Sequence, residues 1–150
     1  MPAPKSILWE KRKPFAPVDL PPKLYKKVVD ACLKMPKRYT YLILQDVIQL
    51  AGRVMDNAKA ANSVFPTNQH EAQIRRDYWI YARADLEALS SRIDRFLEIP
   101  ETLRYKDEIS GRTKGITESE LEEIADLIIQ ERGLITKALE SDKERFKNLP

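Results

Sequence analysis

The chain has 150 residues, of which 43% are hydrophobic and 33% are charged, and its formal net charge is +3. This length fits one domain with a substantial core, and the low content of 4 glycines beside abundant Ala, Leu, Glu, Lys and Arg favours helix over sheet. The single cysteine excludes an intramolecular disulfide, and no apolar run reaches the length of about 18 residues that a membrane span needs, so we expect a cytoplasmic protein with no membrane partner.

Prolines dominate the N-terminal segment, because six of the ten lie at or before Pro22. Proline fixes φ and lacks an amide hydrogen, so we predict a proline-rich, extended, non-helical arm over residues 1–21. The arm also carries Ile7, Leu8, Trp9 and Phe15. These side chains are too apolar for an inert linker, which predicts that the arm docks on its own domain or on a neighbouring one.

Residues 22–150 predict a single domain of amphipathic helices. The first helix is expected over about Pro22–Lys34, and the second follows Pro36, with apolar residues in steps of three and four from Ile43 to Phe65. The third begins after a cap at Thr67 or Asn68 and ends before Pro100, and we expect its buried stripe at Ile74, Tyr78, Ala82, Leu86, Leu89, Ile93 and Phe96.

A capping box formed by Thr117 and Glu120 predicts the start of the fourth helix, whose apolar face continues to Phe146. Residues 100–116, between the third and fourth helices, are expected to form a long exposed loop. The pattern predicts an all-α protein, an antiparallel up-down four-helix bundle preceded by the proline-rich arm.

The residues that usually carry catalysis or bind metals are scarce. His70 is the only histidine, Cys32 matches no nucleophile motif, and the four glycines are too isolated to form a phosphate-binding loop. The carboxylates clustered at the start of the fourth helix fit its dipole, and we assign them a solvated, stabilising role. We therefore predict no catalytic residue, no metal site and no cofactor.

Charge is distributed unevenly along the chain. Residues 1–38 hold ten basic and three acidic side chains, whereas residues 39–150 hold sixteen basic and twenty acidic ones. This asymmetry favours an anionic partner at the basic end, although solvated lysines without a partner would give the same count. The candidate phosphate contacts of this segment are Lys26, Lys27, Lys34, Lys37 and Arg38.

A second candidate patch comprises Arg75, Arg76 and Arg83 in the third helix. At 100° per residue, Arg76 and Arg83 lie within about 20° of one another, away from the apolar stripe. Trp79 and Tyr81 flank the stripe, and either side chain could pack against the protein or stack on a base. Arg92 and Asp85 point toward the stripe instead, which predicts buried ion pairs between helices or subunits.

Two segments carry a resemblance to a known family: Met35-Pro36-Lys37-Arg38-Tyr39-Thr40-Tyr41-Leu42 and Asn68-Gln69-His70-Glu71-Ala72-Gln73-Ile74-Arg75-Arg76-Asp77-Tyr78. They resemble a bacterial four-helix-bundle family that includes the proteins encoded in intervening sequences of 23S ribosomal RNA genes and the accessory variability determinants of diversity-generating retroelements. The resemblance covers about residues 22–146 in helix order. The chain departs from it in the arm and in residues 117–150, where nine acidic side chains outnumber five basic ones.

The resemblance implies a ring-like homo-oligomer, a pentamer in that family, that binds structured RNA and a reverse transcriptase. Leu127 and Leu134 independently favour an oligomer, because they widen the apolar face of the fourth helix beyond what one core requires. The alternative is a protein-only assembly adaptor that binds no nucleic acid and uses the apolar faces and the arm.

Overall fold

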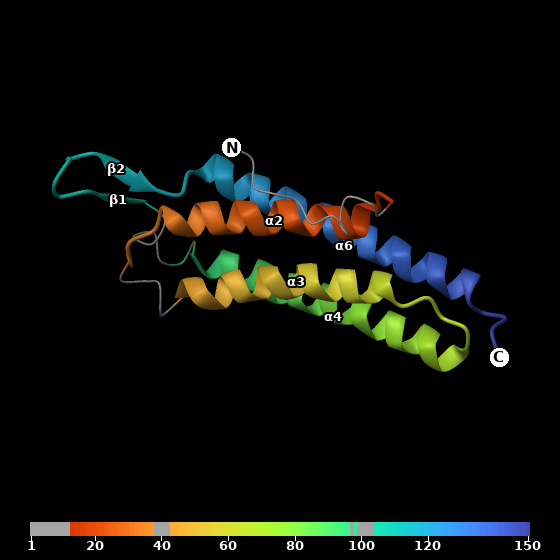
Figure 1. Ribbon diagram of the computed structural model, residues 1–150. Helices are drawn as coiled ribbons and strands as arrows, with labels where there is room; N and C mark the ends of the chain where they lie inside the picture. The colour runs from red at the N-terminus through yellow and green to blue at the C-terminus, as the bar shows by residue number, and fades with distance from the viewer. Residues whose placement is uncertain (1–12, 38–42, 97, 99–103) are drawn as a thin grey trace.

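The computed structural model describes residues 13–37, 43–96, 98 and 104–150. Four long helices run through these residues: α2 (Ala16–Leu33), α3 (Gln45–Ser63), α4 (Gln69–Phe96) and α6 (Glu118–Arg145). A hairpin of β1 (Arg104–Lys106) and β2 (Thr113–Gly115) connects to the start of α6 (Figure 1). The prediction of a mostly helical chain with four helices is confirmed.

Each helix packs against two of the others: α2 against α3 and α6, and α4 against α3 and α6. In Figure 1 the α2–α6 pair forms one layer and the α3–α4 pair the other. The core between them contains apolar side chains from all four helices, among them the fully buried Leu24, Val54, Trp79, Leu86 and Ile135. None of the described helices is long and apolar enough to cross a membrane.

The first helix begins earlier than the sequence predicts, at Ala16 instead of Pro22. Pro17 lies in the first turn, where its missing N–H costs no hydrogen bond, but Pro21 and Pro22 lie inside the helix. Pro17, Val18 and Pro21 are buried, and this burial offsets the lost backbone hydrogen bonds. The extended conformation predicted through residue 21 is therefore wrong for residues 16–21, while residues 1–12 of the predicted arm lie outside the described residues.

The hairpin corrects the loop predicted for residues 100–116. Its strands pair antiparallel, with Tyr105 opposite Lys114. In the turn, Asp107 accepts hydrogen bonds from Lys114 (2.8 Å), Ser110 (3.0 Å) and the Ile109 N–H (3.2 Å), and Gly111 has the positive φ of 70° that favours glycine. The Lys114 ammonium is the largest cause that lowers the pKa of Asp107 to about 2. Two three-residue strands are too short to give an alternating sequence pattern.

The ends of the predicted helices are confirmed where they depend on local capping. The Thr117 hydroxyl accepts from the Glu120 N–H at 3.2 Å, and Asn68, not Thr67, caps α4, because its Oδ1 accepts from the Glu71 N–H at 2.9 Å. Glu71 in turn accepts from the Thr67 hydroxyl, which is the largest cause that lowers the pKa of Glu71.

The buried stripe of α4 differs from the prediction at its first two positions. Ile74 is 36% exposed and Tyr78 is half-buried, whereas the neighbouring Arg75 and Trp79 are buried. The last five predicted positions, from Ala82 to Phe96, are all buried. The predicted face of α3 is wrong only at its end, because α3 ends at Ser63 and Phe65 is 81% exposed.

Candidate nucleic-acid interface

The lysines of the N-terminal patch lie on or just after α2, and Lys26, Lys27, Lys34 and Lys37 are all exposed. Two of them are paired with α6: Lys27 Nζ lies 2.6 Å from Glu123, and Lys34 Nζ lies 2.7 Å from Glu120. The hydrogen bond to Glu123 raises the pKa of Lys27. These pairs bridge α2 and α6, so half of the predicted lysines are already neutralised. Arg38 lies outside the described residues.

Arg75 cannot be the phosphate contact that the sequence predicts, because its side chain is buried. Its Nε donates to Asp142 Oδ2 at 2.6 Å, and its Nη1 donates to the carbonyls of Ala61 and Val64, both at 3.1 Å. Trp79 donates its indole N–H to the same Asp142 oxygen at 3.2 Å, so Trp79 is a packing residue and does not stack on a base. Arg75 therefore joins the ends of α3 and α6 to the start of α4.

The other two arginines of that patch lie on the side of α4 that faces α6. Arg76 is exposed and Arg83 is half-buried, two helical turns further along. The ion pair between Glu87 of α4 and Arg132 of α6 bridges the same two helices. The predicted proximity of Arg76 and Arg83 on one face of the helix agrees with these positions.

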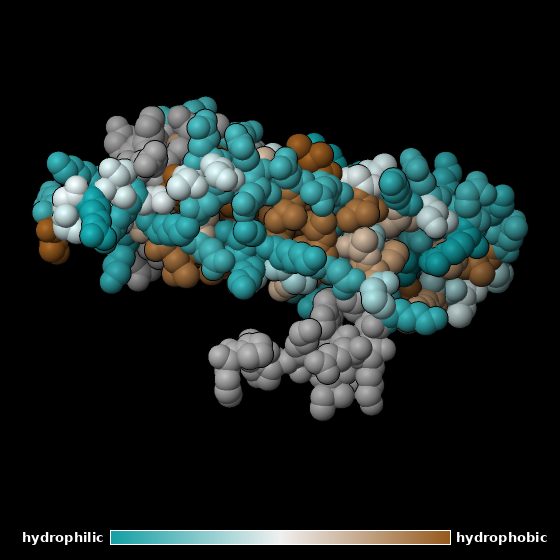
Figure 2. Space-filling view, turned by 90° about the horizontal axis from the view of Figure 1, so that it is seen from above, coloured by the Kyte–Doolittle hydropathy of each residue, from teal (hydrophilic) through white to brown (hydrophobic). Residues whose placement is uncertain are grey.

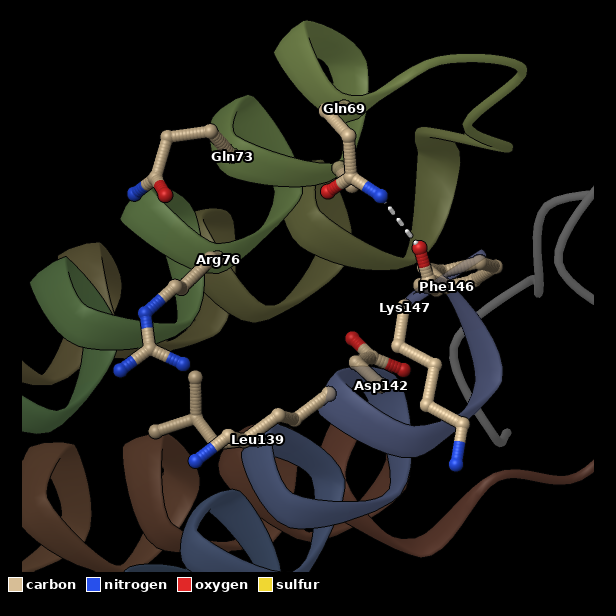
Figure 3. A pocket seen from close by; sticks show the side chains of 9 residues that line it. Gln69, Gln73, Arg76, Leu139, Asp142, Phe146 and Lys147 are labelled. Atoms are coloured by element: carbon tan, nitrogen blue, oxygen red, sulfur yellow. Dashed lines mark hydrogen bonds between the residues drawn. The ribbon is translucent and has the colours of Figure 1, made fainter. Parts of the chain in front are cut away.

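Figure 3 shows the hollow that Arg76 faces, between the start of α4 and the end of α6. Its volume is about 230 Å³, and Arg76 of α4 lies across from Lys143 and Lys147 at the end of α6. Leu139 and Asp142 also line it, and Gln69 closes one end by donating to the Phe146 carbonyl at 2.7 Å. We call this hollow, with Arg83 beyond it, the α4–α6 cleft.

The α4–α6 cleft has an excess of positive charge. Within the described part of the chain, no carboxylate lies within ion-pair distance of Arg76, Arg83 or Lys143, and Lys147 pairs only with the exposed Glu144. Asp142 adds little negative charge to the cleft, because Arg75 and Arg145 (3.2 Å) both neutralise it. An arrangement of unneutralised guanidinium and ammonium groups attracts phosphates.

A second, larger hollow adjoins the cleft. Its volume is about 710 Å³, and the residues that line it include the exposed Phe65, Val64, Pro66, Phe15, Phe146, Arg75 and Arg145. Phe146 lines both hollows, so the two share this residue as a wall. We call this second space the Phe65 hollow.

Sequence reasoning missed Lys143, Lys147 and Phe65. The net charge of residues 117–150 is negative, so the sequence analysis did not single out the two lysines in this segment. Their spacing of four residues places them on one face of the helix. Phe65 fits the helical periodicity of α3 and was therefore assigned to the core. Phe65 lies outside the core because α3 ends at Ser63, two residues before it.

The structure also places the other residues singled out in the sequence. Cys32 is buried, which raises the pKa of its thiol to about 11. His70 is exposed, and no cluster of three or more His, Cys, Asp or Glu residues in the described ranges could hold a metal ion. Arg92 and Asp85 form the predicted inter-helix pairs, with Asp46 at 2.6 Å and with Arg53 at 3.3 Å, but these pairs are partly exposed and not buried.

Comparison of the chain with family models, with curated proteins and with solved structures finds no match.

Proposed function

We propose that this chain is a non-enzymatic, homo-oligomeric accessory protein that binds structured RNA together with a reverse transcriptase, as in diversity-generating retroelements. The observation that supports RNA binding is the α4–α6 cleft, where Arg76, Arg83 and Lys143 have no ion-pair partner among the described residues. The reverse transcriptase and the pentameric ring rest on the family resemblance. The cytoplasm is the proposed compartment, and a single reduced cysteine fits it.

The proposed scaffold is an antiparallel up-down bundle. Pairs between opposite helix ends support this direction: Lys34 near the end of α2 pairs with Glu120 at the start of α6, and Arg92 near the end of α4 pairs with Asp46 at the start of α3. The proline-rich arm is proposed to dock, in the same subunit or on a neighbour.

The proposed phosphate-binding residues differ in how much each is expected to contribute to RNA affinity. Arg76, Arg83, Lys143 and Lys147 of the α4–α6 cleft are the primary contacts, because binding a phosphate there breaks at most the exposed Lys147–Glu144 pair. Lys26, Lys37 and Arg38 are secondary contacts. Lys27 and Lys34 must first give up Glu123 and Glu120, so they contribute least.

Salt-dependent binding tests this assignment with two variants that remove the same charge. In fluorescence anisotropy with a structured RNA, Arg76→Gln with Lys143→Gln should weaken binding and flatten the slope of log affinity against log salt by about 1.4 to 1.8, because two phosphate contacts are lost. The matched control, Lys27→Gln with Lys34→Gln, should change the slope by much less. An equal effect of the two variants would contradict the cleft as the binding surface.

The competing function is a protein-only assembly adaptor, which the exposed apolar side chains Leu33 (78%) and Ile129 (60%) favour. That function predicts negligible RNA binding at moderate salt, and loss of the protein partner when Trp9 or Phe15 is replaced. If the chain binds no RNA with or without a reverse transcriptase, the RNA-binding function is wrong and the adaptor is preferred.

A further inference from the structure

Phe65 is a large aromatic side chain that the fold leaves almost fully in solvent, at 81% exposure. It lies between Val64, the C-cap of α3, and Pro66. The ring of a proline disfavours helical backbone at the residue before it, so Pro66 favours a position for Phe65 outside α3.

The backbone on both sides of Phe65 is anchored. On one side, the buried Arg75 donates to the carbonyls of Ala61 and Val64. On the other side, the Thr67 N–H and hydroxyl both donate to Glu71, in the first turn of α4. The backbone that carries the ring is therefore held in place before any ligand arrives, which lowers the entropic cost of binding to it.

The Phe65 hollow combines aromatic surface with positive charge. Arg145 lies 4.6 Å from the centroid of the Phe146 ring, and its side chain is 58% exposed. Two arginines, Arg75 and Arg145, share the single carboxylate of Asp142, so the lining keeps an excess of positive charge. Aromatic rings beside cations are the surface that single-stranded nucleic acids use, because every base has a face that stacks and every nucleotide a phosphate.

We propose that the Phe65 hollow binds an unpaired nucleotide of RNA, with the base stacked on Phe65 and the phosphate beside Arg145. The RNA backbone then passes Phe146 into the α4–α6 cleft, where Arg76 and Lys143 contact the next phosphates. This inference rests on the proposed RNA binding and adds which part of the structured RNA is recognised, an unpaired segment and not a duplex. A purely apolar peptide fits less well, because it would leave the excess charge of Arg145 uncompensated.

The test measures the affinity of the full chain for a single-stranded oligoribonucleotide, the same oligomer with abasic sites, and a duplex of equal length. Phe65→Ala should weaken binding of the intact single strand about 5- to 150-fold, the range for one lost base–aromatic stack, and should leave the abasic strand and the duplex unchanged. Phe65→Tyr should retain binding. The matched control is Tyr81→Ala, which removes another exposed aromatic side chain, 55% exposed and outside both hollows.

A base analogue that fluoresces less when stacked gives a second readout. Its emission in the single strand should fall on binding to the wild type and stay high with Phe65→Ala. Equal binding of the abasic and intact strands, or an unchanged affinity of Phe65→Ala for the intact strand, would overturn the inference. If Arg76→Gln with Lys143→Gln still weakens RNA binding in that case, the proposed function survives, whereas absence of RNA binding by the wild type would remove both.

Discussion

Glu131 is a carboxyl group in the middle of the apolar core, fully buried on α6. Neither of its oxygens has a hydrogen-bond partner among the described residues. Burial disfavours the charged form and raises the pKa of Glu131 from its usual 4.5 to about 9, so the side chain is protonated at neutral pH. This unsatisfied polar group destabilises the folded state and so lowers the free energy of unfolding.

We predict that Glu131→Leu raises the free energy of unfolding at pH 7 by about 1–3 kcal/mol, because it removes a buried polar group that lacks a partner. Chemical denaturation with urea measures this change. The unchanged cleft should bind RNA as before.

The pH dependence of stability provides a separate prediction. Between about pH 4.5 and 9 the folded state holds the Glu131 proton while the unfolded state has released it. Proton binding at Glu131 therefore favours the folded state fully below pH 4.5, and this contribution to the free energy of unfolding is lost as the pH rises through that window. Relative to Glu131→Gln, which cannot ionise, the wild type should lose up to about 1.4 kcal/mol per pH unit. A constant difference between the two proteins from pH 5 to 8 would show that the carboxyl group has an ordinary pKa.

At the scale of the helices, the buried Arg75–Asp142 ion pair joins α4 to α6. Arg75 also donates to two carbonyls at the end of α3, so one side chain connects three helices. A buried charge left alone is costly, so Asp142→Ala should lower the free energy of unfolding by about 3–5 kcal/mol. Lys147→Ala, which removes an exposed pair with Glu144, should change it by less than about 1 kcal/mol. Denaturant unfolding of both variants checks this difference, and a small cost for Asp142→Ala would mean that the pair is not structural.

At the scale of the whole molecule, the α2–α6 face carries the surface expected for self-association. Figure 2 shows hydrophobic side chains gathered in the middle of this face and hydrophilic ones around them. Leu134 lines a hollow with Phe15 and Ala16 there, and Leu127, seven residues earlier on the same side of α6, is only partly buried. The homo-oligomer stays a prediction, and this face is its proposed interface.

We predict that Leu127→Glu with Leu134→Glu reduces the mass of the particle to that of the 17.4 kDa monomer, because it introduces charge into the proposed interface. Light scattering at micromolar concentration measures the mass, and circular dichroism confirms that the variant is folded. Ile109→Glu, at a residue 97% exposed in the hairpin turn, is the control and should leave the mass unchanged. A monomeric wild type would contradict the oligomer.

The sequence by itself determined the four helices and where most of them begin and end. Their signals are local: apolar spacing of three and four residues, the Asn68 and Thr117 caps, and Pro66 after α3. The prolines predict an extended arm at residues 16–21, but these residues are helical. The burial of Pro17, Val18 and Pro21 outweighs the lost backbone hydrogen bonds.

Only the tertiary structure decided which basic residues are free to bind. Arg75 and Arg76 are adjacent in the sequence, yet Arg75 is buried against Asp142, 67 positions away, while Arg76 faces the α4–α6 cleft. Lys27 is neutralised by Glu123, 96 positions away. Whether a charged side chain is paired depends on which helix faces meet, and that is set by how the apolar stripes of all four helices pack together.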